Sequence, residues 1–209
     1  MWHAHSQCHF FRWQGANEIG LALKANFVLK SLCLNCNPLG DEGIAALADG
    51  LRWNGYLEKL HVQYCGIGCY GVGALAQDVI ANDYCRLTDL SLKGNELEPE
   101  GVAAIADSLK ENRTLTAINL ADTGMGNDPI SRDAMREALV RHPTLINLDL
   151  NLNAIGTEGG QMLLEVLSLN TNIVKCGVFE RLGLLYRDIQ DKVAENGSKK
   201  KKGKKKKKK

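Results

Sequence analysis

Residues 87–112 read LTDLSLKGNELEPEGVAAIADSLKEN, and this stretch contains the pattern that decides the fold. It begins as L-x-x-L-x-L-x-x-N, continues through a turn that contains glycine, and ends with apolar residues at helical spacing. The same start occurs five times, as LKSLCLNCN from Leu29, LEKLHVQYC from Leu57, LTDLSLKGN from Leu87, LTAINLADT from Leu115 and LINLDLNLN from Leu145, and in degenerate form as IVKCGV from Ile173. Successive starts are 28, 30, 28, 30 and 28 residues apart. A fixed period of this length predicts a stack of similar structural units.

Each start precedes a segment with the periodicity of an amphipathic helix. In residues 40–54, GDEGIAALADGLRWN, the side chains of Ile44, Leu47 and Leu51 fall on one helical face. Asp41 lies where an acidic side chain favours a helix N-terminus. Each unit is therefore predicted to be a short strand followed by a helix. Similar helices are expected in residues 71–82, 101–112, 132–142 and 159–170, and residues 15–26 resemble the helical half of a preceding unit.

A strand and a helix of this size cannot bury their apolar sides alone, but stacked units fill one continuous core with their leucines. Strands that advance in one direction with a helix between them must be parallel. The sequence therefore predicts an α/β solenoid, shaped as a horseshoe, with parallel strands on the concave face and helices on the convex face.

A side chain that can form hydrogen bonds recurs at the bend after each strand. The ninth positions of the five starts are Asn37, Cys65, Asn95, Thr123 and Asn153. Buried backbone groups at a bend need partners, and an Asn amide supplies both a donor and an acceptor. We expect a structural role for this row.

These repeats resemble the ribonuclease-inhibitor-like class of leucine-rich repeats, whose units of about 28 residues carry a full helix. The resemblance covers residues 15–179 and rests on turns such as NPLGDEGIAAL, NELEPEGVAAI and NAIGTEGGQML. It implies the horseshoe fold, but the class includes ribonuclease inhibitor, the Ran GTPase-activating protein, tropomodulin-like proteins, innate sensors and axonemal proteins. No single activity follows from the fold.

Composition limits the compartment. No apolar run is long enough to cross a bilayer, and the first residues, MWHAHSQCHFFRW, lack the features of a secretory signal. The seven cysteines are odd in number and follow no disulfide-domain spacing, which favours reduced thiols and a cytoplasmic protein, with the cytoskeleton, the cilium or the nucleus as alternatives. Residues 1–14 are expected to be an atypical or disordered leader. The pattern leaves open whether the chain is a piece of a longer repeat array.

The candidate binding surface is the concave strand face, because the variable positions between the leucines point away from the core. We expect a protein partner there. The candidate residues are Lys59, His61, Gln63, Tyr64, Asp89, Lys93, Asn119, Asp122, Asn147, Asp149 and Asn151.

Metal and cofactor sites are not expected. Cys33 and Cys36 form a C-x-x-C, and His61 falls one strand away from Cys33. However, no fourth ligand follows at zinc-finger spacing, and Cys65 occupies the buried bend position. The metal-capable residues of the leader, including His3, His5, Cys8 and His9, are better explained as part of that segment.

No catalytic motif appears either. The chain has no G-x-S-x-G elbow, phosphate-binding P-loop or H-E-x-x-H helix, so we expect no enzyme, cofactor or small-molecule substrate. Regulation of a small GTPase stays open, because such an activity would use a scaffold surface. The chain departs from the Ran activator in having fewer units and in ending on a basic run where that family has an acidic one.

The C-terminal residues have a different character. Leu182, Leu185, Ile189 and Val193 fall at helical spacing, which predicts a capping helix over residues 180–196, with a partner-binding helix as the rival interpretation. Residues 197–209 have strong self-repulsion and are expected to be disordered. Their basic residues are Lys199, Lys200, Lys201, Lys202, Lys204, Lys205, Lys206, Lys207, Lys208 and Lys209. The rest of the chain has 16 basic and 24 acidic residues, a net charge of about −8.

The predicted function is therefore a non-enzymatic protein-interaction scaffold. Its lysine tail would bind an anionic surface such as tubulin tails, RNA or acidic lipid. The alternatives are a regulator of a small GTPase and a cytoskeletal or axonemal component.

Overall fold

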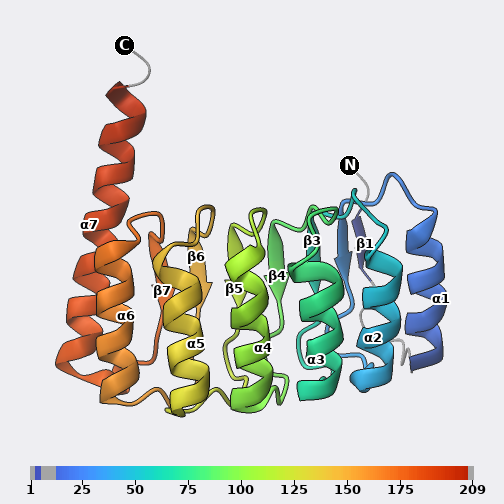
Figure 1. Cartoon of the computed structure of the whole chain (residues 1–209), viewed down its shortest axis with the longest axis horizontal. Helices are drawn as coiled ribbons and strands as arrows, with labels where there is room; N and C mark the ends of the chain where they lie inside the picture. The colour runs from blue at the N-terminus through green and yellow to red at the C-terminus, as the bar shows by residue number, and fades with distance from the viewer. Residues whose placement is uncertain (1–2, 6–12, 207–209) are drawn as a thin grey trace.

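The computed structural model describes residues 3–5 and 13–206, and within these residues it is a single stack of strand–helix units. Figure 1 shows helices α1 to α6 side by side in one row, with the strands in a second row behind them. The strands are β1 (His3–His5), β2 (Ser31–Cys33), β3 (Lys59–His61), β4 (Asp89–Ser91), β5 (Ala117–Asn119), β6 (Asn147–Asp149) and β7 (Lys175–Gly177). The helices are α1 (Trp13–Lys24), α2 (Gly40–Leu51), α3 (Cys69–Leu75, continued by a π-helical turn over Ala76–Ile80), α4 (Glu98–Glu111), α5 (Pro129–Val140), α6 (Thr157–Leu169) and α7 (Leu184–Lys206). The predicted leucine-rich-repeat solenoid is confirmed.

The strands form one parallel sheet in chain order, β1 to β7. Their register follows the sequence period, so that Leu32 pairs with Leu60, Leu60 with Leu90, and Leu90 with Ile118. Because equivalent residues of neighbouring units lie side by side, one apolar position builds a continuous ridge through the stack. That ridge faces the helices and is buried along its length.

The core lies between the strand row and the helix row. Leu90, Leu92 and Leu120 are fully buried there, as the repeat register predicts. Ile105 and Leu109 of α4 approach from the other side. Helices α1 and α2 touch through their backbones, since a Cβ atom on Gly50 would lie 2.2 Å from the carbonyl oxygen of Gly20.

The described part of the N-terminal leader adds a strand to the sheet. Residues 3–5 form β1, which pairs in parallel with β2, and α1 begins at Trp13 rather than at residue 15. Without β1, strand β2 would be the edge of the sheet and would expose a row of unpaired backbone groups. A short extended segment can form hydrogen bonds with these groups through its own backbone, whatever its side chains are. The expected metal-capable residues Cys8 and His9 lie outside the described residues.

The C-terminal helix is longer than predicted. It begins at Leu184 rather than at residue 180 and continues to Lys206, so the prediction of disorder is wrong over residues 197–206, while residues 207–209 lie outside the described part. Lysine is a good helix former, and Glu195 accepts ion pairs from both Lys192, at 2.9 Å, and Lys199, at 2.5 Å. These pairs offset part of the repulsion between neighbouring ammonium groups.

The first half of α7 covers the end of the stack, as the apolar spacing predicts. Ile189 is fully buried, and Tyr186 and Val193 pack against the core, as does Leu182 just before the helix. Leu184 remains exposed, so part of the apolar edge expected of a partner-binding helix, the rival interpretation, is present. In Figure 1 the last turns of α7 project beyond the row of helices.

Candidate protein-binding face

The row of bend residues joins each unit to its neighbours and is therefore structural. The side-chain oxygen of Asn95 accepts hydrogen bonds from the backbone N–H of Cys65, at 2.9 Å, and of Ile67, at 3.1 Å. Its amide nitrogen donates to the carbonyl oxygens of Val62 and Leu92. Asn153 repeats this arrangement two units later, where it accepts from Thr123 and Met125.

The two smaller side chains of the row contribute fewer bonds. Thr123 donates its hydroxyl to the carbonyl oxygen of Leu120, and Cys65 donates its thiol to that of Leu34 at 3.2 Å. Burial raises the pKa of the Cys65 thiol to about 11. The cysteine at this position is therefore a neutral structural donor.

A second polar row, which the sequence analysis missed, closes the opposite bend. It follows the helices and comprises Asn26, Asn54, Asn82, Asn112, His142 and Asn170. Asn112 is typical, because its amide nitrogen donates to the carbonyl oxygen of Ile80 at 2.7 Å and its oxygen accepts from the backbone of Thr114 and Leu115. The signal was present in the sequence, since these residues also recur every 28 or 30 positions.

The two polar rows hold the backbone, and the concave strand face is left available. In Figure 1 helices α1 to α6 all lie on the other side of the sheet. Lys59, Tyr64 and Asp122 are exposed. The remaining candidates are half-buried, namely His61, Gln63, Asp89, Lys93, Asn119, Asn147, Asp149 and Asn151.

The N-terminal half of this face contains cross-strand polar pairs. His61 on β3 lies 3.4 Å from the carboxylate of Asp89 on β4, and its hydrogen bond lowers the pKa of that carboxyl. Gln63 donates to the hydroxyl of Ser91 at 2.8 Å. The side chains are thus held in position before any ligand arrives, which lowers the entropy lost on binding.

Tyr64 forms the edge of this half. Its backbone is left-handed, with φ of 53°, and its ring lies directly against Gly94, where a Cβ atom would be 2.1 Å from the ring. The ammonium group of Lys93 lies 5.8 Å from the centre of the same ring. A bulky side chain rarely adopts this backbone conformation, so the exposed ring is held at a cost in stability.

The C-terminal half is acidic and rich in amides. Asn151 donates to Asp149 at 2.7 Å, and the oxygen of Asn119 accepts from the backbone of Ala121 at 2.9 Å. The buried oxygen of Asn147 has no hydrogen-bond partner among the described residues. This half therefore offers acceptors, whereas the N-terminal half also offers the cations Lys59 and Lys93.

The residues considered as metal ligands do not form a cluster. No group of three His, Cys, Asp or Glu side chains within residues 13–201 could hold a metal ion. Cys36 is exposed at the turn, while Cys65 is buried in the bend row. The described residues thus do not bring Cys33, Cys36 and His61 together as a site.

The lysine run is carried by the end of α7, away from the concave strand face. Lys199 is exposed and pairs with Glu195, and Lys200 reaches the carbonyl oxygen of Asn172 at 3.5 Å. The described lysines Lys199 and Lys200 thus lie on a different element from the residues of the concave strand face.

Comparisons with known proteins agree with this architecture. A family model described as "Leucine Rich repeat" matches residues 25–48, 85–106 and 141–164. NACHT, LRR and PYD domains-containing protein 13 of Homo sapiens is 31% identical over 151 residues, which are 72% of this chain and 14% of that protein. Ribonuclease inhibitor of Sus scrofa is 30% identical over 154 residues, which are 72% of this chain and 32% of that protein. The chain thus spans less than a third of the length of these relatives.

Solved structures share the fold over nearly the whole chain. The actin-binding site 2 of leiomodin-1 has a TM-score of 0.59 at 15% identity and covers 94% of this chain and 95% of its own. The C-terminal domain of Caenorhabditis elegans tropomodulin has a TM-score of 0.55 at 12% identity, with coverages of 92% and 97%. None of the described helices is long and apolar enough to cross a membrane. The period, the parallel strand row and these similarities together show that the chain is a leucine-rich-repeat protein of the ribonuclease-inhibitor-like class.

Proposed function

We propose that this protein is a non-enzymatic interaction scaffold that binds a protein partner through its concave strand face. The observation that carries the proposal is the preorganised polar surface at β3 and β4. His61 and Asp89 are already paired there, and the exposed ring of Tyr64 is held against Gly94 in a left-handed backbone conformation. Side chains fixed in this way lose little entropy when a partner binds.

The chemistry of the face indicates a polar and charged partner surface. Lys59 and Lys93 complement carboxylates near the N-terminal half, whereas Asp122 and Asp149 complement basic groups near the C-terminal half. Aromatic residues are frequent among those that dominate binding energy, so Tyr64 is the first candidate for such a role. The names of two similar proteins, a ribonuclease inhibitor and an actin-binding site, describe binding to other proteins and support this class of function.

The lysine-rich end of α7 would add electrostatic tethering to an anionic surface. A helix places successive residues about 1.5 Å apart along its axis, so the lysines that belong to α7, up to Lys206, bring many positive charges close together. Such a density of positive charge attracts polyanions, and the attraction weakens as salt is added. The six cysteines described by the structure are free, which supports a reducing compartment such as the cytoplasm.

The experiment captures the protein partner from native lysate with the full chain, identifies it, and then measures affinity with purified components at several salt concentrations. Replacing His61, Tyr64 and Asp149 together by alanine should weaken partner binding by at least tenfold, since each important contact contributes about 1 to 2 kcal/mol. The matched control replaces Tyr70, Asp83 and Arg141, which are exposed outside the concave strand face, and should bind like the parent.

Polyanion binding provides the second readout. The triple substitution in the concave strand face should leave the affinity for RNA or acidic vesicles nearly unchanged, because those ligands need only the lysines. If the triple substitution leaves partner binding intact while removal of Lys199–Lys209 abolishes it, the proposed role of the concave strand face is wrong.

The two alternative functions stay predictions with their own assays. A regulator of a small GTPase would change the rate of GTP hydrolysis by its partner. A cytoskeletal component would co-sediment with intact microtubules more strongly than with microtubules whose acidic tails have been removed.

A further inference from the structure

The turns after the strands are joined by hydrogen bonds that run from each unit to the next. The bonds are Cys36 N to Gln63 O at 2.8 Å, Tyr64 N to Lys93 O at 2.8 Å, Gly94 N to Ala121 O at 3.0 Å, and Asp122 N to Asn151 O at 2.8 Å. In alternate units the backbone N–H of the next residue also donates to the unit ahead. Cys65 N–H donates to the side-chain oxygen of Asn95, and Thr123 N–H donates to that of Asn153. Each turn therefore depends on the next turn for its backbone partners.

This series stops at Leu152. Its backbone N–H group has no acceptor among the described residues, although the preceding bond, from Leu150 N to Gly177 O, is present at 2.8 Å. The N–H group of Asn153 has no acceptor there either, as at the equivalent Asn95 within the stack. For Leu152 the cause is the path of the chain, which leaves the repeat pattern at Phe179. It enters the short 3-10 helix Glu180–Leu182 and then Gly183, with φ of 61°, instead of forming another turn of the same kind.

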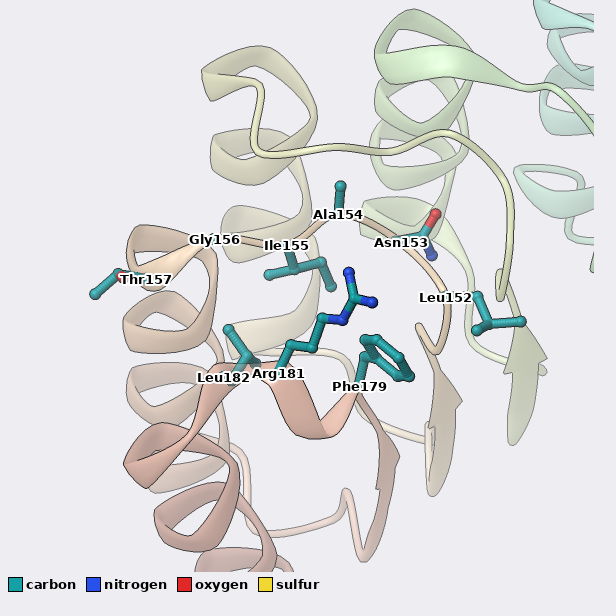
Figure 2. Close-up of a pocket in the computed structure, with 9 residues that line it drawn as sticks. All are labelled: Leu152, Asn153, Ala154, Ile155, Gly156, Thr157, Phe179, Arg181 and Leu182. Atoms are coloured by element: carbon teal, nitrogen blue, oxygen red, sulfur yellow. The ribbon is translucent and has the colours of Figure 1, made fainter.

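The departure of the chain leaves a pocket of about 530 Å³ in the place of the next turn. The pocket is lined by Leu152, Asn153, Ala154, Ile155, Gly156, Thr157, Phe179, Arg181 and Leu182. Figure 2 shows the guanidinium group of Arg181 pointing into it, toward the loop that carries Ala154 and Ile155. Leu152 and Phe179 are exposed at its edge, at 53% and 40%.

Arg181 gives the pocket its charge preference. Its guanidinium carbon lies 5.3 Å from the centre of the Phe179 ring, and it pairs with no carboxylate within the described part of the chain. A guanidinium that is stacked on an aromatic ring keeps its N–H donors free for a planar acceptor. The pocket thus combines two unpaired backbone donors, one cation and an apolar wall.

We propose that this pocket binds an acidic turn segment of a partner protein, of the form Asp-x-Ile or Asp-x-Leu, which takes the position of a further repeat. The template lies within the chain itself, where Asn95 accepts from the preceding turn and Leu97, two residues later, is fully buried. In the bound segment the aspartate would accept from the N–H of Asn153 and from Arg181, and the apolar residue would pack against Ile155 and Leu182. Arg181 favours aspartate over the asparagine of the repeats, because a charged acceptor strengthens the hydrogen bond.

This site is separate from the concave strand face, since none of the pocket residues belongs to the set proposed above to bind a partner there. The two proposals can fail independently. A protein with His61 and Tyr64 both replaced by alanine should retain full binding of the acidic segment.

The test uses blocked heptapeptides based on residues 151–157, NLNAIGT, titrated into the full-length ¹⁵N-labelled protein. The version with aspartate in place of the asparagine at position 153 should shift the amide signals of Leu152 and Asn153. It should bind about tenfold more tightly than the unmodified peptide, a difference of about 1.4 kcal/mol. A second change of its isoleucine to alanine should weaken binding again.

Protein variants identify the source of this preference. Arg181→Gln should remove the advantage of the aspartate peptide, whereas Arg141→Gln, at the exposed arginine that directly follows α5, should leave it unchanged. Unfolding midpoints of both variants check that the fold is intact. The proposal is overturned if the aspartate peptide produces no shift at millimolar concentration, if Arg181→Gln keeps the preference, or if acetate alone gives the same shifts.

Discussion

The backbone N–H of Cys65 donates to the side-chain oxygen of Asn95 at 2.9 Å, although 30 residues separate them in the sequence. The same oxygen also accepts from Ile67, and the amide nitrogen of Asn95 serves two carbonyl groups. One buried side chain therefore satisfies four backbone groups in two successive units.

Asn95→Ala should lower the free energy of unfolding by about 3 kcal/mol or more, because buried donors and acceptors lose their partners. Chemical denaturation measures the change. Asn151→Ala is the matched control, since Asn151 is half-buried on the concave strand face and bonds mainly to Asp149. Equal losses in the two variants would contradict the structural role of the bend row.

Leu90→Ala or Leu120→Ala should each destabilise the stack by roughly 2 to 5 kcal/mol, because both leucines are fully buried between units. Leu169→Ala should change stability by less than about 0.5 kcal/mol, since Leu169 is 60% exposed at the end of α6. Denaturation midpoints distinguish these cases. A Leu90 variant as stable as the Leu169 variant would show that the repeat register is wrong.

His142 is an imperfect member of the second polar row, so His142→Asn should stabilise the protein. Its Nδ1 atom accepts from the backbone of Leu145 at 3.2 Å, which places the ring proton on Nε2, and Nε2 is buried without a partner among the described residues. In the neighbouring units Asn112 and Asn170 use this position to donate to carbonyl groups. Asparagine at this position should raise the free energy of unfolding by about 1 kcal/mol at pH 7, as measured by denaturant unfolding.

The same residue should make stability depend on pH. Burial lowers the pKa of His142 to about 4, so between pH 6.5 and pH 4 the unfolded chain binds the proton more readily than the folded protein. Stability should therefore fall as the pH is lowered through this window, by about 3 kcal/mol in total from this group. Comparing the parent with His142→Asn at pH 7 and pH 4.5 isolates the effect, and equal losses in both proteins would contradict it.

Removal of Lys199–Lys209 should leave the free energy of unfolding within about 1 kcal/mol of the parent, because the ion pair between Lys199 and Glu195 is exposed. The same truncation should reduce both the affinity for RNA or acidic vesicles and its dependence on salt. Asn196→Ala should instead lower the free energy of unfolding and leave polyanion binding unchanged. The reason is that the buried amide of Asn196 donates to the carbonyl oxygens of Leu167 and Ile173. A truncation that unfolds the protein would instead show that the lysine run is part of the cap.

The sequence alone predicted the fold because each unit contacts mainly the units before and after it. The partner of a residue is then found one period away, so the spacing of Leu60, Leu90 and Ile118 already implies their adjacent positions in the sheet. The same reasoning predicted the structural role of Asn95 and the capping contact of Ile189. The second polar row follows the same period, since Asn54, Asn82 and Asn112 are 28 and 30 residues apart.

Only the tertiary structure decided the features that break the period. The path of the chain at Phe179, the pocket beneath Arg181 and the added strand at residues 3–5 depend on packing at the two ends of the stack, where no repeating neighbour defines the position. The pairing of His61 with Asp89 and the position of the Tyr64 ring against Gly94 likewise depend on atomic distances across the sheet. A repeated sequence determines what recurs, because its contacts are local in the stack, whereas the ends and the exposed side chains are determined by contacts that occur once.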